Sequence, residues 1–345
     1  MRRPKQPPDS VTARQEIPED QALSIGRPRT LDECVGQTEL IESLRISIAA
    51  AKQRAEPLEH VLLHGPPGLG KTTIARVIAT EMGAEVRVSS GPALERAGDL
   101  VGILTNLQPR DVFFIDEVHR LPRVVEEYLY PAMEEFEVDF VLDSGPHART
   151  VRLPLKPFTL VGATTRAGLL TPALRERFGI FHYLRFYSPE ELREIVVRYA
   201  LVLRTDVEPA AAEEIARRSR GTARIAKRLL RRARDYAQVK AGGKVTAKIA
   251  DEALTAEGVD KAGLARLDRL FLSAIIEHYG GGPVGIETIA ATLNEEAVTL
   301  EDVVEPYLLQ AGLLARTAAG RKVLPAAYEH LGMAGEAEAR LFGTE

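Results

Sequence analysis

The sequence predicts an α/β core with a parallel sheet flanked by helices, followed by a small helical domain and a winged-helix domain. Strand-like and helix-like runs alternate up to residue 184, which is typical of a mostly parallel sheet. From 185 to 256 helical periodicity continues alone, and from 257 to 345 helical stretches precede two short extended runs around a turn. We therefore expect three domains, over 1–184, 185–256 and 257–345.

The composition is that of an ordinary soluble protein, with 45% hydrophobic and 27% charged residues and a net charge of −4. No apolar run is long enough to span a bilayer. Residues 1–24 are polar and rich in proline, so we expect a disordered arm and not a secretory signal. The single cysteine, Cys34, excludes an internal disulfide and fits a reducing compartment. We expect a cytoplasmic protein with no membrane partner.

Short apolar runs predict the strands of the sheet. They are HVLLHG at 60–65, EVRVSS at 85–90, DVFFID at 111–116, FTLVGATT at 158–165 and FHYLRF at 181–186. A helix is expected over 39–52. Residues 139–155 break the alternation with two β-rich runs around Ser144-Gly145-Pro146, which predicts a hairpin that protrudes from the core.

After Tyr187 the strand signals stop, and four helical patterns follow, each with Ser, Thr or an acidic residue near its start. The tail has three helical stretches, a turn over 316–320 and the run RKVLP, an order that resembles a winged helix-turn-helix. Residues 217–234 hold eight arginines and one lysine. This stripe predicts either a solvated, ion-paired helix face or an electrostatic footprint for DNA or nucleotide.

The segment from Gly65 to Thr72 matches the phosphate-binding pattern G-x-x-x-x-G-K-[ST] in full, between a predicted strand and a predicted helix. The glycines, which include Gly68 and Gly70, let backbone N–H groups approach phosphate oxygens. Lys71 is expected to reach the β- and γ-phosphates of ATP, and the Thr72 hydroxyl to ligate Mg²⁺. Thr73 completes this end of the ATP site.

Two carboxylates, Asp116 and Glu117, follow the apolar run VFFI. The carboxyl end of a central strand delivers them to the crevice where α/β folds bind ligands. We expect Asp116 to hold Mg²⁺ and Glu117 to orient the attacking water. One threonine of the later strand end, Thr164 in preference to Thr165, is a candidate for a hydrogen bond to the γ-phosphate or the water, although threonine also simply suits a strand end.

Arginines near the predicted sheet and in the helical domain are candidates for contact with phosphate. Arg175 and Arg177 lie close together in LRERF and could not both easily serve the nucleotide of their own subunit. An arginine supplied in trans stabilises transition-state charge. Arg224, at a predicted helix start, is expected to face the cleft.

Together these segments resemble the AAA+ ATPases and, among them, the RuvB family, over residues 26 to 332. The blocks that carry the resemblance are GPPGLGKTT, SSGPALERAGDL, DVFFIDEVHRL, YPAMEEF, FTLVGATTRAGLL, LRERFGI and SRGTARIAKRLLRRARD. The resemblance implies an AAA+ P-loop NTPase core with a helical lid, assembled as a homohexameric ring around duplex DNA. It implies ATP-driven branch migration of Holliday junctions with RuvA, in recombination and repair, with RuvC as a further partner in the resolving complex.

The resemblance also assigns roles to residues. Arg177 matches the arginine finger, with Arg175 as the alternative, and Arg224 matches the sensor arginine of the lid. The matching nucleotide-pocket residues are Glu134, Glu135, Phe136, Tyr187 and Arg27. The residue before Arg27 is usually aliphatic in the family and is Gly26 here, so Ile25 is the alternative contact.

The same resemblance places the partner contacts. The hairpin at 139–155 matches the element that docks RuvA, with Val151 and Leu153 as its apolar anchors. Arg316 and Arg321 match arginines that touch the DNA backbone, although the turn between them, TAAG, is less basic than is common in the family. An ordinary exposed loop is the alternative interpretation of these two arginines.

Two other classes of protein share the ATP-binding motifs: an AAA+ protein that remodels proteins, and a nucleotide-dependent switch with little hydrolysis. The winged-helix domain favours DNA as the substrate, because it presents a helix and a basic turn to phosphates. Glu117 favours hydrolysis over a pure switch.

Overall fold

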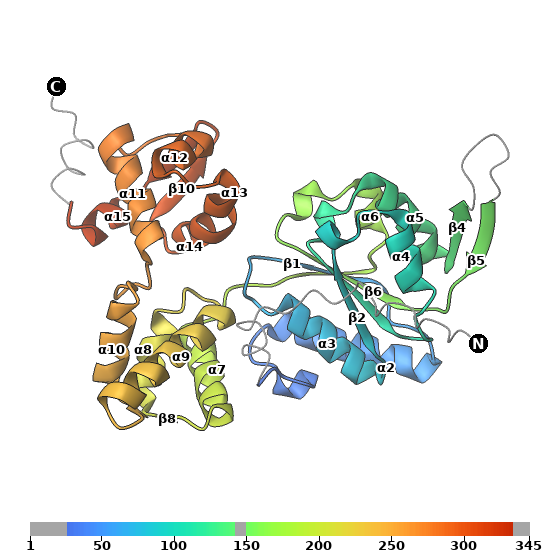
Figure 1. Ribbon diagram of the computed structural model, residues 1–345, viewed down its shortest axis with the longest axis horizontal. Helices are drawn as coiled ribbons and strands as arrows, with labels where there is room; N and C mark the ends of the chain where they lie inside the picture. The colour runs from blue at the N-terminus through green and yellow to red at the C-terminus, as the bar shows by residue number, and fades with distance from the viewer. Residues whose placement is uncertain (1–25, 142–149, 334–345) are drawn as a thin grey trace, which may run out of the picture. The chain divides into compact units, whose positions relative to one another are not determined.

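The computed structural model describes residues 26–141 and 150–333, and the chain divides into two compact units (Figure 1). The first unit comprises Met1–Cys34, Thr38–His64 and Lys71–Tyr183. The second comprises Val35–Gln37, Gly65–Gly70 and Leu184–Glu345. The glycine-rich turn thus belongs to the second unit, although it joins a strand and a helix of the first.

The first unit is built on a five-stranded sheet in the order β2-β3-β6-β1-β7. Its strands are β1 (Val61–His64), β2 (Val86–Ser90), β3 (Val112–Asp116), β6 (Thr159–Thr164) and β7 (Ile180–Tyr183). All neighbouring strands pair in parallel, as the sequence predicts. Because parallel strands end at one edge, the sheet brings His64, Asp116 and Thr164 to the same side.

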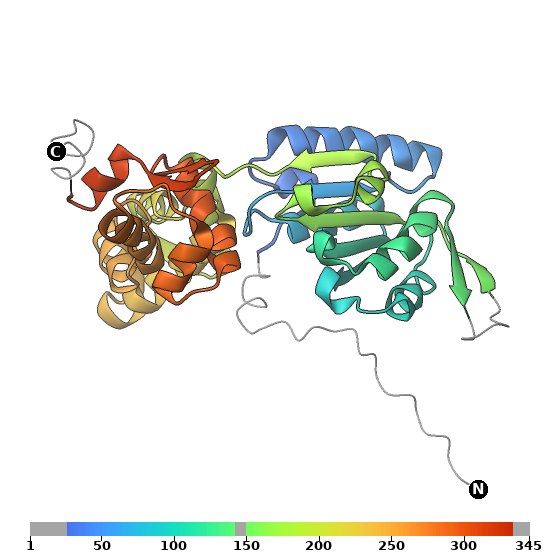
Figure 2. The same ribbon diagram turned by 90° about the horizontal axis from the view of Figure 1, so that it is seen from above.

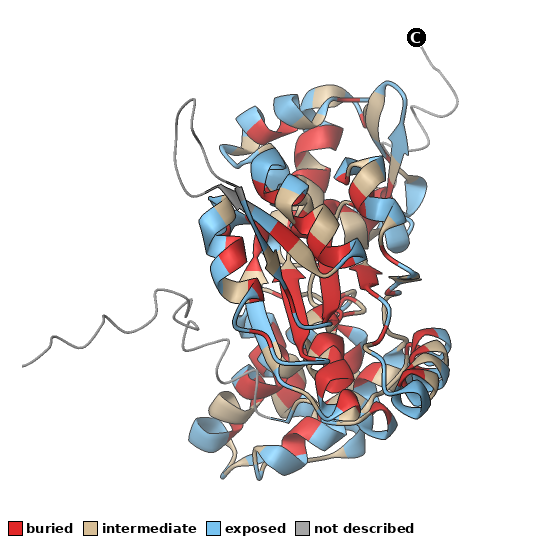
Figure 3. Ribbon diagram, turned by 90° about the vertical axis from the view of Figure 1, so that its right-hand side faces the viewer, coloured by how far each residue is buried: buried red, intermediate tan, exposed pale blue. Residues whose placement is uncertain are grey.

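Helices cover both faces of the sheet (Figures 1 and 2). They are α2 (Thr38–Arg54), α3 (Lys71–Met82), α4 (Ala97–Leu104), α5 (Arg123–Glu134) and α6 (Pro172–Glu176). Side chains of a strand alternate between its faces, and Phe113 and Ile115 pack with Leu129 of α5. The central strands are therefore apolar at nearly every position, and Figure 3 shows them buried.

A two-stranded hairpin projects from this unit (Figure 1). Strand β4 (Glu137–Val141) pairs antiparallel with β5 (Thr150–Pro154), and the ion pair between Arg152 and Asp139 (3.0 Å) links the two strands. The predicted hairpin is confirmed, but its first strand begins at Glu137, before the predicted start. The predicted turn Ser144-Gly145-Pro146 lies outside the described residues.

The second unit contains a bundle of four helices, as predicted. They are α7 (Pro189–Val202), α8 (Pro209–Arg217), α9 (Ala223–Lys240) and α10 (Ala247–Ala256). The prediction that residues 185–256 are purely helical was wrong, because β8 (Asp206–Val207) and β9 (Lys244–Val245) form a short parallel pair. Strands of two residues are too short to show any periodicity.

The same unit continues into a winged helix-turn-helix. Its elements are α11 (Arg266–Tyr279), α12 (Ile286–Leu293), α13 (Ala297–Thr299), the π-helical turn η5 (Leu300–Val304), α14 (Glu305–Gln310), β10 (Leu314–Thr317), β11 (Gly320–Val323) and α15 (Pro325–His330). Strands β10 and β11 form the wing and place Arg316 opposite Arg321. The final helix, α15, was not predicted.

Candidate nucleotide-binding site

In the turn between β1 and α3, the backbone at Gly65 and at Gly68 leaves little room for a side chain. Gly68 has φ +83°, and a Cβ there would lie 3.2 Å from the Cβ of Arg224. Gly65 has φ +149°, and a Cβ there would lie 2.6 Å from the carbonyl oxygen of Leu184. Lys71 is the first residue of α3 and is only 7% exposed, so the side chain that the motif assigns to the phosphates is enclosed by the protein.

The helical bundle contacts this turn directly. The backbone N–H of Arg224 donates to the carbonyl oxygen of Gly68 at 3.3 Å. The Tyr187 hydroxyl donates to the carbonyl oxygen of Leu69 at 3.0 Å, and its backbone N–H donates to Gly221 at 2.9 Å. Two residues expected at the nucleotide, Tyr187 and Arg224, are thereby brought to the glycine-rich turn.

The acidic pair lies at the carboxyl end of β3. The backbone N–H of Glu117 donates to Asp116 Oδ1 at 3.1 Å. Glu117 has φ +50°, a left-handed conformation that costs a non-glycine residue roughly 1–2 kcal/mol. Such strain concentrates at functional sites, because the surrounding structure holds a side chain where function needs it. Here the conformation ends the strand abruptly and sets the Glu117 side chain at the sheet edge.

The two threonines at the end of β6, Thr164 and Thr165, make different contacts. Thr164 is fully buried, and its Oγ1 lies 2.9 Å from Nδ1 of His119. Thr165 Oγ1 donates to Glu117 Oε2 at 3.4 Å. Thr165 therefore touches the acidic pair directly, whereas Thr164, the residue favoured by the sequence, reaches Glu117 through His119.

Two histidines at this edge were missed in the sequence. His119 Nδ1 lies 3.3 Å from Glu117 Oε2, so its ring bridges Glu117 and Thr164. Its only sequence signal is its position in DEVH, directly after the acidic pair. His64 ends β1, and burial, together with the charge of Lys71, holds the pKa of its imidazole below the ordinary value.

The side chain of Arg177 contacts two residues of α5 in the same unit. Its Nη2 lies 3.2 Å from Glu134 Oε2, and its guanidinium stacks 4.3 Å from the centre of the Tyr130 ring. Arg175 is exposed and lies over Phe181 at 5.2 Å. The structure thus brings together two predicted site residues, Arg177 and Glu134, and keeps Arg175 on a separate aromatic contact.

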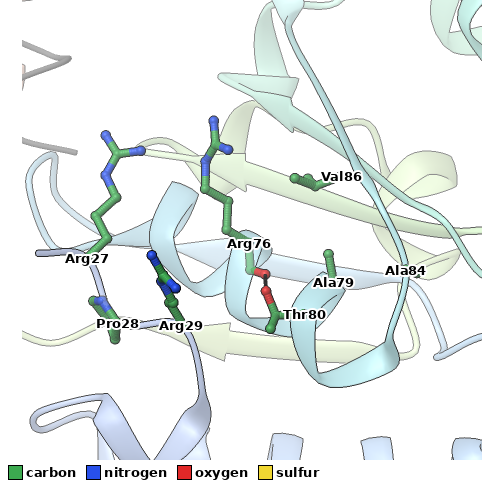
Figure 4. Close-up of a pocket in the computed structure, with 8 residues that line it drawn as sticks. All are labelled: Arg27, Pro28, Arg29, Arg76, Ala79, Thr80, Ala84 and Val86. Atoms are coloured by element: carbon green, nitrogen blue, oxygen red, sulfur yellow. Dashed lines mark hydrogen bonds between the residues drawn. The ribbon is translucent and has the colours of Figure 1, made fainter. Parts of the chain in front are cut away.

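The remaining predicted pocket residues are more dispersed. Glu135 ends α5 as its exposed C-cap residue, and Phe136 packs its ring 5.9 Å from that of Phe158 in the core. Arg27 lines a pocket of about 470 Å³ with two further arginines, Arg29 and Arg76. Figure 4 shows the three guanidinium groups extending to the same side. Gly26 is exposed, and Ile25 lies outside the described residues.

The wing arginines share one buried carboxylate. Glu305 is 1% exposed at its side chain and forms ion pairs with both Arg316 and Arg321. Arg321 also pairs with Glu301 at 2.9 Å and is 12% exposed, whereas Arg316 is 54% exposed. Burial lowers the pKa of the Arg321 guanidinium, but the hydrogen bonds and charges of Glu305 and Glu301 outweigh this effect, so that its pKa lies above the ordinary value.

On the hairpin, the two predicted anchors differ. Val151 is exposed, whereas Leu153 is partly buried and packs against the core of the first unit. Both lie on β5 two residues apart, so their side chains leave the same face of the strand.

With a helical lid hydrogen-bonded to the phosphate-binding turn of a parallel α/β sheet, this is the architecture of an AAA+ P-loop ATPase. Three family models match in succession: the Holliday junction DNA helicase RuvB P-loop domain over 26–184, the RuvB AAA lid domain over 187–260 and the RuvB C-terminal winged helix domain over 261–332. The chain belongs to the RuvB family.

Individual relatives cover nearly the whole chain. The Holliday junction branch migration complex subunit RuvB of Desulfosudis oleivorans is 58% identical over 328 residues, which span 94% of this chain and 96% of the relative. The solved structure of the Thermotoga maritima RuvB Holliday junction branch migration motor is 49% identical, with a TM-score of 0.82, and the match covers 89% of this chain and 98% of that one. A point mutant of the same protein matches at 50% identity and a TM-score of 0.83, with the same coverage.

Two kinds of feature are absent from the described residues. No helix there is long and apolar enough to cross a membrane. No cluster of three or more His, Cys, Asp or Glu side chains in that part of the chain could hold a metal ion by itself.

Proposed function

We propose that this chain is an ATP-hydrolysing motor that moves duplex DNA and promotes branch migration of Holliday junctions together with RuvA, in homologous recombination and DNA repair. The observation that carries the proposal is the hydrogen bond between the lid and the glycine-rich turn at Arg224 and Gly68, in a unit that continues into a winged-helix domain. Membership of the RuvB family supports it, as does the 58% identity to a Holliday junction branch migration complex subunit.

In this proposal ATP binds with its phosphates at the turn that includes Gly65, Gly68 and Gly70. The ammonium of Lys71 compensates their charge, and Thr73 and Thr72 follow on the first turn of α3. The hydroxyl of Thr72 and the carboxylate of Asp116 are the oxygen donors that Mg²⁺ prefers, so they fit its site. Mg²⁺ would neutralise charge on the phosphates.

Glu117 is the residue we assign to the attacking water. Its carboxylate is partly exposed, accepts a hydrogen bond from Thr165 at Oε2, and has Nδ1 of His119 3.3 Å from the same oxygen. These contacts fix the orientation of the carboxylate, so that it can accept a proton from a water molecule held in one position. Thr164 then acts on Glu117 through His119, as a positioning residue.

Arg177 is assigned to the nucleotide of a neighbouring subunit in a homohexameric ring. The ion pair with Glu134 and the stacking on Tyr130 hold its guanidinium in a defined place. A guanidinium supplied in trans stabilises transition-state charge only when a neighbouring subunit holds the nucleotide beside it. Arg175 remains the alternative, and Arg224 acts from the lid of the same subunit.

DNA contact is assigned to the wing, through Arg316 and Arg321, and RuvA docking to the hairpin, through Val151 and Leu153. We further propose that RuvC joins the assembly when junctions are resolved. The most exposed of these side chains, Arg316, is the one best placed to meet a phosphate.

The test measures ATP hydrolysis with and without duplex DNA and RuvA, beside migration of a synthetic four-way junction. We expect DNA to stimulate hydrolysis and RuvA to be required for junction migration. Glu117→Gln should keep ATP binding and lose hydrolysis, because Glu117 acts on water only during the reaction. Lys71→Ala should lose binding, because Lys71 contacts the ground-state phosphates. Wild-type hydrolysis by the Glu117→Gln chain would refute the role given to this residue.

A further inference from the structure

A short segment between α8 and α9 is attached to the glycine-rich turn at one end. It begins at Arg218, includes Thr222, the N-cap residue of α9, and extends to Arg224 in the first turn of that helix. Arg224 donates its backbone N–H to Gly68 at 3.3 Å, and Gly221 accepts a hydrogen bond from the backbone N–H of Tyr187 at 2.9 Å. A Cβ on Gly221 would lie 2.8 Å from the Cβ of Phe186, so this part of the segment is packed tightly.

The middle of the segment contacts the winged-helix domain through the side chain of Arg220. Arg220 has φ +53° and is 9% exposed. Its Nη1 lies 3.1 Å from Asp268 Oδ2 in α11, and its Nη2 donates to the carbonyl oxygen of Val303 in η5 at 2.8 Å. The guanidinium also lies 5.0 Å from the centre of the Tyr307 ring in α14. One arginine of the lid thus contacts three elements of the winged-helix domain.

These contacts are desolvated. Asp268 is 1% exposed, and its Oδ2 accepts a second hydrogen bond from the backbone N–H of Ala265 at 2.7 Å. Burial raises the pKa of Asp268, and the positive charge of Arg220 opposes this. Removing the partner of a buried carboxylate destabilises a folded protein far more than removing that of an exposed one. The charged form of Asp268 therefore depends on the ion pair with Arg220. The strained backbone at Arg220 is consistent with a side chain held in place for its contacts.

The neighbouring arginine makes a useful contrast. Arg218 is fully buried, but its ion pairs are with Glu214 and Asp251, which belong to the helices of the lid. Arg218 therefore stabilises the lid itself. Within the segment, it is Arg220 whose side chain links the lid to the winged-helix domain.

We propose that Arg220 is a positioning residue that couples the glycine-rich turn to the winged-helix domain. When the occupant of the turn changes, Arg224 follows Gly68, and the packed segment passes this displacement to Arg220 and hence to α11, η5 and α14. Because coupling is reciprocal, the nucleotide then sets the DNA affinity of the wing, and DNA sets the nucleotide affinity. This inference rests on the proposed binding of ATP and DNA.

The experiment measures this coupling as the ratio of two dissociation constants for DNA, each determined with a different nucleotide. The dissociation constant for duplex DNA is determined with ADP and with a non-hydrolysable ATP analogue, using the full-length wild type, Arg220→Gln and a matched control. Arg232→Gln is that control, because Arg232 is a lid arginine whose ion pair is with Asp235 on its own helix. We expect the two constants to differ by about fivefold or more in the wild type and in the control. In Arg220→Gln they should converge, while hydrolysis without DNA stays at the wild-type rate.

Each outcome decides the matter. A wild type that neither hydrolyses ATP nor binds DNA refutes the proposed function itself. A wild type with both activities but equal affinities in the two nucleotides refutes the coupling. An Arg220→Gln chain that keeps the wild-type ratio, even with weaker binding in both states, reduces Arg220 to a structural residue and overturns the proposal.

A second variant covers the case in which Arg220→Gln does not fold. Asp268→Asn removes the buried charge as well as the ion pair, so it is the milder change. If the two residues act as a pair, the two dissociation constants should converge in Asp268→Asn alone, as expected for Arg220→Gln. A wild-type ratio in Asp268→Asn would contradict a shared role.

Discussion

At the scale of single residues, Glu305 shows how one carboxylate organises two functional candidates. It is buried beneath the wing and pairs with both Arg316 and Arg321, which face each other across β10 and β11. Arg321 is nearly enclosed and has Glu301 as a second partner, whereas Arg316 keeps half of its surface. The two arginines therefore have unequal freedom to meet a DNA phosphate.

We expect Arg316→Ala to weaken binding about equally across unrelated duplexes and to reduce the salt slope of log affinity by about 0.9, the effect of one lost phosphate contact. Arg321→Ala should in addition destabilise the winged-helix domain by up to about 3 kcal/mol, because the buried carboxylate of Glu305 then keeps only the exposed Arg316 as its partner. Titrations at several salt concentrations and thermal unfolding measure the two effects. Lys322→Ala is the control, since Lys322 is exposed and its side chain leaves the opposite face of β11.

An unchanged salt slope for Arg316→Ala would show that this residue does not touch phosphate. A loss confined to one duplex sequence would instead indicate that it reads bases.

At the scale of an element, the hairpin β4–β5 combines anchoring and display. Leu153 packs on the core of the first unit, whereas Val151 is left exposed on the same face of β5. Exposed apolar side chains on a projecting element usually mark an interaction surface. Arg152, between them, points to the other face and pairs with Asp139 and Glu137.

Val151→Asp should therefore weaken RuvA binding by at least about tenfold, the effect of losing an apolar hot spot. Hydrolysis without RuvA should be unaffected, because the change is on an exposed strand position. Purified RuvA in a binding titration and in junction migration provides the readout, with Arg152→Gln as the control on the opposite face. Undiminished RuvA affinity of the Val151→Asp chain would exclude this surface as the docking site.

At the scale of the whole molecule, three histidines of the first unit link its stability to pH. Burial holds the pKa values of His60, His64 and His182 below the ordinary value. For His60 the geometry explains why: Nδ1 accepts the backbone N–H of Leu160 at 2.9 Å, so a proton on that atom would break the bond. Nε2 lies 3.0 Å from the carbonyl oxygen of Met133, which fits the neutral tautomer with its proton there.

These depressed pKa values predict acid sensitivity. Below about pH 6.5 these histidines become protonated in the unfolded chain but stay neutral in the folded unit. Their contribution to the free energy of unfolding is therefore complete above this pH and decreases as the pH falls toward the folded pKa values. Thermal unfolding between pH 5 and 8 should show this, and His60→Gln should make the dependence shallower. His278→Gln, at an exposed position, is the control. A melting temperature that is constant over this range would contradict the prediction.

The sequence by itself determined most of the elements and the motifs of the candidate site, because both depend on neighbours in the chain. The glycine-rich turn, the acidic pair at Asp116 and Glu117, and the parallel sheet follow from patterns only a few residues long. The exceptions are short elements, such as β8 and β9, which lack the length to produce a periodic signal.

Only the tertiary structure decided which polar side chains meet. Arg220 reaches Val303 across 83 positions of sequence, and Thr165, not Thr164, meets Glu117 across 48. The chain holds 45 basic and 49 acidic residues, so local patterns leave very many pairings open. Burial selects among them, because a desolvated charge is stable only beside its partner, and packing decides which charges are desolvated.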